Sequence, residues 1–183
     1  MVPPGDAEVV SAGRPPAQEV LHQARRKAAS LVTRFPNAVV LGSDTLISLD
    51  GAAIGKPNNR EDSRAILRRL QGRVHEVVTA VVILYGGMTF EAVESVRVHM
   101  RDFTEAELES YLATGDSVDK AGAYSIQGPG ASLIAGIDGD YLAVVGLPLR
   151  AVAEGLRRMG IPVSCDLDRL YRERAFLNWR TFN

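Results

Sequence analysis

The sequence has one cysteine, few lysines, no long apolar run and almost no net charge, and each absence excludes a class of protein. The single cysteine, Cys165, allows no internal disulfide and is typical of a reducing compartment. No apolar stretch approaches the roughly 18 residues of a membrane span, and the first residues lack the basic and apolar segments of a secretion signal. A net charge of −1 gives no overall field that would attract nucleic acid or an anionic membrane. We therefore predict a cytoplasmic protein that binds neither nucleic acid nor membranes.

Lysine is nearly excluded from the chain. Only Lys27, Lys56 and Lys120 are lysines among the 21 basic residues, and all the others are arginine. A coding bias toward arginine would explain this composition. The three lysines then either mark positions that need a compact, flexible ammonium group or are chance survivors. Composition alone leaves both interpretations open.

The length of 183 residues and the hydrophobic content of 46% suffice for one domain with a substantial core. Apolar spacing and capping residues predict helices over residues 15–31, 60–70, 104–115 and 148–159. Strands are predicted over residues 38–41, 46–49, 52–54, 74–84, 90–100, 132–137 and 141–145. Because hairpins alternate with helical crossovers, we expect an α/β fold with a mixed sheet and not a doubly wound parallel one.

Three short segments hold side chains that suit chemistry. Asp44 follows a predicted buried strand among small residues, where a carboxylate can orient water or hold a divalent ion, although an Asx turn gives the same pattern. Lys56 precedes a proline and is placed to neutralise a phosphate oxygen, or is simply a solvated loop lysine. Residues 119–130 combine a charge pair, a glutamine and several glycines, which fits a ligand loop or a structural turn.

Other kinds of site find no support in the sequence. The chain has neither a phosphate-loop nor a dinucleotide fingerprint. The three histidines are far apart without the spacing of metal ligands, and Cys165 has no histidine near it, so neither zinc nor a thiol nucleophile is indicated. Carboxylate, metal and lysine chemistry remains.

Five motifs occur in a fixed order, at residues 42–45 (GSDT), 55–57 (GKP), 70–75 (LQGRVH), 119–128 (DKAGAYSIQG) and 145–149 (VGLPL). In order and spacing they resemble the Maf family of nucleoside triphosphate pyrophosphatases, over about residues 8–159. The resemblance implies an elongated mixed α/β fold with flanking helices and a central cleft, similar to that of inosine triphosphate pyrophosphatases. It further implies a homodimer that hydrolyses a nucleoside triphosphate to the monophosphate and pyrophosphate with Mg²⁺, or with Mn²⁺ or Co²⁺. We expect one Maf-like domain over residues 1–159 and a C-terminal extension over residues 160–183.

The resemblance also assigns roles to residues of this chain. Asp44 matches the family's proton acceptor and a metal ligand, and Glu8 matches loosely an acidic residue near the metal. The positions tied to substrate choice are Thr45 and Gln127, and the IQG form around Gln127 resembles the subgroup that acts on dTTP and UTP. The phosphate-side residues that match are Lys27, Lys56 and the charge pair Asp119 and Lys120. All three lysines of the chain therefore fall on motif positions.

The chain departs from the family pattern at both ends. Family members open with a strand and a Ser-x-Ser-Pro-Arg-Arg loop, and nothing before Glu8 resembles it. A start codon placed too late, a fragment, or a loss of activity would each explain this difference. If activity has been lost, the alternative function is a weakly active nucleotide-binding regulator of cell division (septum formation). In residues 160–183, aromatic and arginine residues alternate as in an amphipathic helix, which packs on the body or forms a partner contact.

Overall fold

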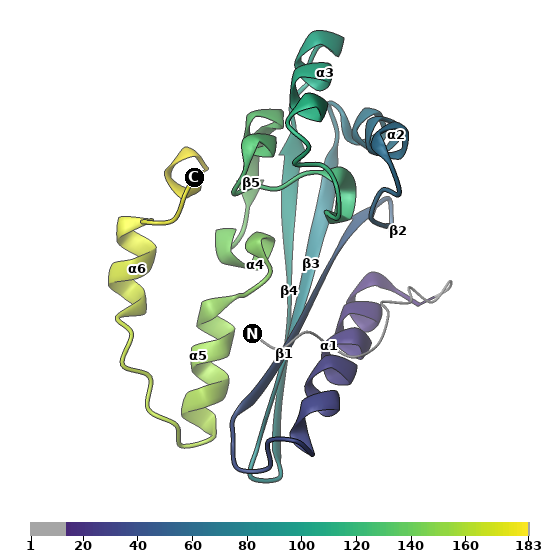
Figure 1. Ribbon diagram of the computed structural model, residues 1–183. Coiled ribbons are helices and arrows are strands. Elements are labelled where there is room, and N and C mark those ends of the chain that lie inside the picture. The colour runs from purple at the N-terminus through teal and green to yellow at the C-terminus, as the bar shows by residue number, and fades with distance from the viewer. Residues whose placement is uncertain (1–13, 183) are drawn as a thin grey trace.

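A computed structural model of the chain describes residues 14–182, and an open sheet of five strands runs through these residues (Figure 1). The helices are α1 (Pro16–Val32), α2 (Arg60–Leu70), α3 (Glu105–Ala113), α4 (Tyr141–Val145), α5 (Leu149–Arg158) and α6 (Leu167–Glu173). The strands are β1 (Val40–Leu49), β2 (Ala52–Ile54), β3 (Val74–Tyr85), β4 (Met88–Met100) and β5 (Ile134–Asp138). Three 3-10 turns complete the list: η1 (Ala121–Ala123), η2 (Pro129–Leu133) and η3 (Trp179–Thr181). The predicted α/β class with flanking helices is confirmed.

The strand pairing differs from the expected mixture of parallel and antiparallel neighbours. The strand order is β2-β1-β3-β4-β5, and every neighbouring pair within residues 14–182 is antiparallel. The crossover through α2 does return the chain in the same direction, so β2 and β3 both run opposite to β1. Because β1 lies between them, these two parallel strands are not neighbours and form no ladder.

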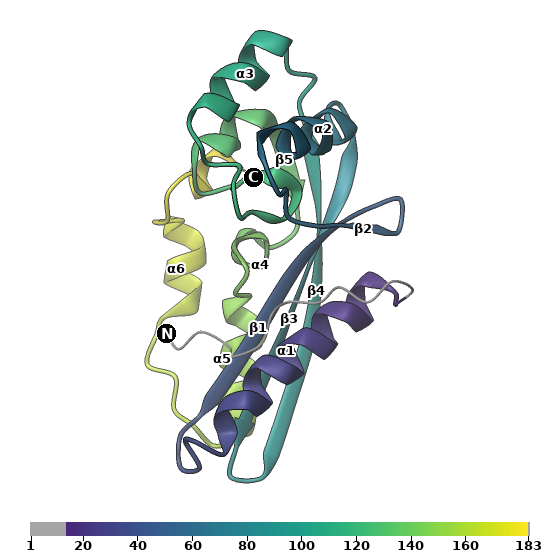
Figure 2. The same ribbon diagram turned by 45° about the vertical axis from the view of Figure 1, so that its right-hand side comes forward.

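Helices cover both faces of the sheet (Figure 2), and the side chains of β3 alternate between these faces. Val78 and Ala80 pack with Val20 and Ala24 of α1. Val81 points to the other face and packs with residues of α5. Since successive side chains of a strand point to opposite faces, neighbouring residues of β1 are likewise divided between the α1 face and the α4–α5 face.

The strand β1 is longer than predicted, and this places Asp44 differently. The GSDT motif was expected to follow a strand that ended at residue 41, but residues 40–48 pair without interruption with β3. The Asx-turn interpretation of Asp44 is therefore wrong. A glycine in this strand allows α1 to approach, because a Cβ added to Gly42 would lie 2.4 Å from the carbonyl oxygen of Ala24.

Residues 141–145 form the helix α4 and not the predicted strand. The Asp140 side chain caps this helix by accepting a hydrogen bond from the Leu142 N–H at 2.9 Å. Gly146 ends it in the left-handed conformation, with φ at 106°. A short run of apolar residues has the same appearance in a buried strand and a buried helix, so periodicity gave no means of separating them.

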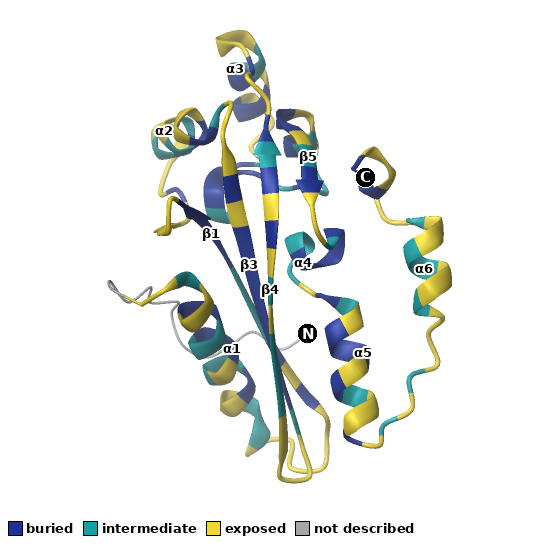
Figure 3. Cartoon of the chain, turned by 180° about the vertical axis from the view of Figure 1, so that it is seen from behind, coloured by how far each residue is buried: buried dark blue, intermediate teal, exposed yellow. Residues whose placement is uncertain are grey.

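The remaining predicted helices and hairpins are confirmed within a few residues. Asn59 caps α2, and Thr104 and Glu107 form the expected capping box of α3. In the tail, α6 is short and has no fully buried residue (Figure 3). Trp179, by contrast, is only 4% exposed. Its ring stacks on Tyr141 with 5.3 Å between centroids, so the tail packs on the body as one of the two interpretations expected.

Candidate functional site

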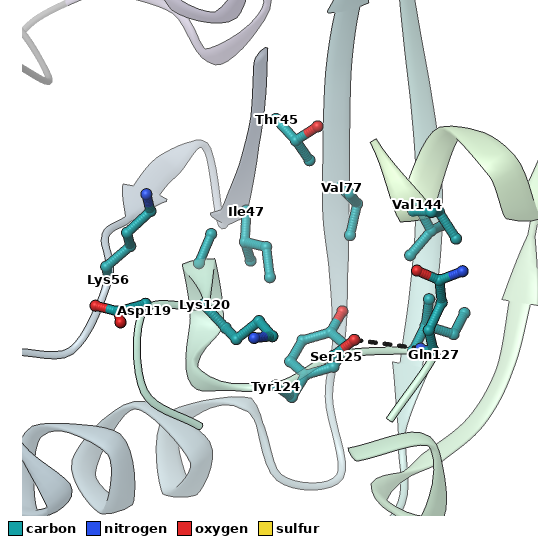
Figure 4. Close-up of a pocket in the computed structure, with 13 residues that line it drawn as sticks. Thr45, Ile47, Lys56, Val77, Asp119, Lys120, Tyr124, Ser125, Gln127 and Val144 are labelled. Carbon is teal, nitrogen blue, oxygen red and sulfur yellow. Dashed lines mark hydrogen bonds between the residues drawn. The ribbon is translucent and has the colours of Figure 1, made fainter. Parts of the chain in front are cut away.

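Five of the predicted site residues line one pocket on the α4–α5 face of the sheet (Figure 4). They are Thr45, Lys56, Asp119, Lys120 and Gln127. Lys56 and Asp119 lie at one end, and Gln127 lies at the other end near α4. The pocket is thus assembled from β1, the loop after β2, β3, the 119–128 segment and α4.

The floor and walls of the pocket are largely apolar. Ile47 of β1, Val77 of β3, Val144 of α4 and the ring of Tyr124 line it between the polar ends. An apolar slot with a few polar groups at its ends is the usual form of a site for a small organic ligand. Its two ammonium groups, Lys56 and Lys120, suit a ligand that carries negative charge at one end.

Backbone geometry in the 119–128 segment brings together the two loops that carry the pocket lysines. Gly122 has φ at 69°, and its N–H donates to the carbonyl oxygen of Gly55 at 3.3 Å. A Cβ at Gly122 would lie 2.3 Å from a methyl carbon of Ile47, so only glycine lets this segment lie so close to β1. The loop of Lys56 and the loop of Lys120 are thereby joined at the pocket.

Asp44 and Lys27 form a second group on the opposite face of β1. The Lys27 Nζ donates to the Asp44 Oδ1 at 2.5 Å, and the two side chains are 21% and 11% exposed. Because Lys27 belongs to α1, Asp44 points to the α1 face, while its chain neighbour Thr45 lines the pocket. The two side chains form an ion pair that is largely shielded from solvent.

The two groups lie on opposite faces of β1, which is an edge of the described sheet over part of its length. The strand β2 pairs with β1 only from Ile47 onward, so residues 40–46 of β1 have a described strand on one side alone. A ligand that crosses this edge beside Asp44 and Thr45 would contact both groups. Glu8, the remaining predicted site residue, lies outside the described residues.

A polar relay beneath Thr45 was not anticipated from the sequence. The fully buried Thr79 of β3 donates its hydroxyl proton to the carbonyl oxygen of Ala143 at 2.8 Å. The hydroxyls of Thr45 and Thr79 are also 2.8 Å apart. Since a threonine hydroxyl has one proton, Thr79 accepts in this second bond and Thr45 donates. A single hydroxyl within the apolar run of β3 was the signal that could have drawn attention to Thr79.

A buried histidine supports the pocket from behind. His75 Nε2 lies 2.7 Å from the Tyr124 hydroxyl, and burial lowers the pKa of His75 to about 4, with a smaller contribution from His99. Burial also raises the pKa of Tyr124 far above its ordinary value. Both side chains are therefore neutral near pH 7 and serve as structure, and no acid-base role follows for them.

The described residues offer few ligands to a metal ion. Among residues 14–182, no group of three or more His, Cys, Asp or Glu side chains is placed to hold one. Mg²⁺ on a nucleotide needs only one or two protein carboxylates besides the phosphates. Asp44 fits that demand as the single described carboxylate of the predicted metal ligands.

The protein-family comparison agrees with the motifs. A model described as "Maf-like protein" matches residues 1–159. The chain belongs to the Maf family. Maf relatives named dTTP/UTP pyrophosphatase cover most of its length. That of Dictyoglomus thermophilum is 44% identical over 149 residues, which are 80% of this chain and 77% of the relative. That of Symbiobacterium thermophilum is 42% identical over 162 residues (88% and 83%), and that of Pyrococcus abyssi is 39% identical over 151 residues (82% and 81%).

The Maf motifs all reach the site. The LQGRVH motif supplies His75 behind the pocket, and the VGLPL motif supplies Val145 to its wall. Gly146, in the same motif, lies against Thr45, because a Cβ there would lie 3.2 Å from the Thr45 hydroxyl oxygen.

None of the helices within residues 14–182 combines the length and the apolar character that a membrane span requires.

Proposed function

We propose that this Maf family member hydrolyses dTTP, UTP or modified pyrimidine nucleotides to the monophosphate and pyrophosphate. The observation that carries the proposal is the convergence of Thr45, Lys56, Asp119, Lys120 and Gln127 in one pocket. The names of the three relatives support the same substrates. The apolar slot accommodates a pyrimidine ring, and the ammonium groups accommodate phosphates.

In this proposal, Gln127 and Thr45 select the base of the nucleotide. The amide of Gln127 can both donate and accept, as the N3–H and carbonyl groups of uracil or thymine require. Thr45 donates its hydroxyl proton to Thr79, so it offers a ligand only oxygen lone pairs and a methyl group. An acceptor favours the N3–H of uracil over the bare N3 of cytosine.

Hydrolysis takes place where the polyphosphate crosses the edge of β1. Lys56 and Lys120 on one face and Lys27 on the other spread the negative charge of the phosphates. Asp44 accepts a proton from the water that attacks the α-phosphorus. The new P–O bond forms as the bond to the bridging oxygen breaks, and pyrophosphate leaves.

A divalent cation, Mg²⁺ or alternatively Mn²⁺ or Co²⁺, would be held by Asp44 and Glu8 together with the phosphates, and would supply further neutralisation of their charge. Asp44 is suited to binding the cation or to accepting the proton. The proposal also includes a cytoplasmic homodimer, which sizing chromatography of the purified chain would test. A monomer at micromolar concentration would remove that part.

The test is pyrophosphate release from a panel of nucleoside triphosphates with Mg²⁺ or Mn²⁺, with Asp44→Asn in parallel. We expect turnover of UTP and dTTP that the substitution abolishes. Binding of nucleotides without turnover in the intact chain would instead support the cell-division regulator. Faster hydrolysis of a purine nucleotide such as ITP than of UTP would contradict the role of Gln127 and favour the function of the related purine pyrophosphatases.

A further inference from the structure

The tail that follows the Maf match returns to the pocket and holds the backbone on both sides of Gln127. The side-chain amide of Asn178 donates to the carbonyl oxygen of Ile126 at 3.1 Å and to that of Gly128 at 3.2 Å. These two carbonyls flank Gln127, whose own N–H donates to the Ser125 hydroxyl at 3.3 Å. The segment that carries Gln127 is therefore tied to residue 178, which is distant in sequence.

Asparagine is well suited to this position. Its amide has two N–H bonds, and each serves one carbonyl oxygen, which can only accept. Residue 178 has φ at 61°, a left-handed conformation that asparagine tolerates better than most residues. An aspartate of the same shape would place acceptor oxygens against acceptor oxygens.

Aromatic packing fixes Asn178 over the loop. The adjacent Trp179 is buried and stacks on Tyr141, and Phe182 packs on the same ring with 6.3 Å between centroids. The Tyr141 hydroxyl also donates to the carbonyl oxygen of Leu177. Tyr141 begins α4, the helix whose Val144 lines the pocket. One short helix thus joins the tail to the pocket.

We propose that Asn178 is a positioning residue for Gln127, and that residues 174–182 belong to the apparatus that selects the base. This inference rests on the proposed function, because it gives Gln127 the task of contacting the base. Without the amide of Asn178, the loop keeps its sequence but loses two of the bonds that hold its backbone. The Gln127 side chain then samples several positions, and selectivity falls while the reacting groups at Asp44 are untouched.

The experiment compares Asn178→Gly and Asn178→Asp with a neighbour. Glycine removes the side chain without straining the left-handed backbone, and aspartate keeps the shape but removes both donors. The control is Leu177→Ala, which changes a side chain that is 68% exposed one residue away. We expect both Asn178 variants to lower kcat/KM for UTP about fivefold to tenfold, mainly through KM, as expected for lost hydrogen bonds. The control should match the wild type.

Two further measurements separate positioning from a general loss of structure. In a Gln127→Ala background, Asn178→Gly should have no additional effect on kcat/KM, because the two residues act as one unit. In the absence of substrate, amide hydrogen exchange at residues 125–128 should be faster in Asn178→Gly than in the wild type. Additive kinetic effects, or unchanged exchange, would overturn the inference. A wild-type chain without turnover would instead refute the proposed function, and the exchange measurement would still decide the role of Asn178.

Discussion

The hydroxyl of Thr45 donates its proton to Thr79, which passes its own to the carbonyl oxygen of Ala143. The direction follows from the carbonyl, which can only accept, and it runs from the pocket into the sheet and on to α4. Thr45 is therefore fixed as an acceptor toward anything in the pocket. The fully buried Thr79 thus decides whether the Thr45 hydroxyl acts as a donor or an acceptor in the pocket.

Replacing Thr79 by valine should relax base selection. The Thr45 hydroxyl would then be free to donate, and the preference for UTP over CTP, measured as the ratio of kcat/KM values, should fall about fivefold. The carbonyl of Ala143 would lose its partner, so we also expect the free energy of unfolding to fall by about 1–3 kcal/mol. Thr79→Ser is the matched control and should retain the ratio. An unchanged ratio in a folded Thr79→Val protein would show that Thr45 does not contact the base.

Arginine should not replace the three lysines, although the chain uses arginine almost everywhere else. A guanidinium is planar and wider than an ammonium, so Lys27→Arg, Lys56→Arg and Lys120→Arg should each lower kcat/KM for UTP about tenfold. The reverse exchange Arg157→Lys, at an exposed position of α5, should leave kcat/KM unchanged. If the arginine variants were fully active, the lysines would be chance survivors of the composition bias.

Buried His75 should make the fold sensitive to mild acid. Its pKa of about 4 in the folded state lies below the ordinary value of 6.5, so the unfolded chain binds more protons between these two pH values. Stability from this group is complete above pH 6.5 and is lost as the pH falls toward 4, by about 2 kcal/mol between pH 7 and pH 5. Urea unfolding of the wild type and of His75→Gln at both pH values isolates this contribution. Equal losses in the two proteins would contradict it.

A methyl group at Gly42 should separate Lys27 from Asp44. The Cβ of Gly42→Ala would stand 2.4 Å from the Ala24 carbonyl oxygen and 3.0 Å from the Ala28 Cβ, so α1 must move away from β1. We expect a loss of about 1–3 kcal/mol in stability and a fall in turnover larger than the fall in nucleotide binding. Gly136→Ala is the comparison, since nothing lies within 4 Å of its added Cβ and its φ is not in the left-handed region. Unimpaired turnover in Gly42→Ala would remove the need for the Lys27–Asp44 pair.

Much of this architecture was predictable from local sequence, and the exceptions have physical causes. Caps and hairpins are encoded by a few adjacent residues, so Asn59 and the capping box at Thr104 were found. The length of β1 was not, because its ladder with β3 holds glycine, serine and aspartate that seldom favour a strand. The helix α4 was missed because a five-residue apolar run has no distinguishing period.

Convergence of the pocket residues was expected from the Maf resemblance, but their division between two faces was not. In the sequence, GSDT has the appearance of one polar cluster. In the structure, the extended backbone of β1 turns the side chains of Asp44 and Thr45 to opposite faces. The contributions of Thr79 and Asn178 depend on contacts between segments 34 or more residues apart in sequence. No local pattern reports such contacts.

The division of Asp44 and Thr45 between opposite faces has one further consequence, for the alignment of β1 on β3. A slip of a single residue would exchange the two side chains, turning the carboxylate into the pocket and the threonine toward α1. The contacts of the Ser43 hydroxyl oppose this slip. It lies 2.9 Å from the Ala80 carbonyl oxygen and 2.8 Å from the Gly146 carbonyl oxygen. The same slip would also turn the buried Leu46 and Ile47 to the wrong faces, so correct folding of the core and correct placement of the site depend on one strand alignment.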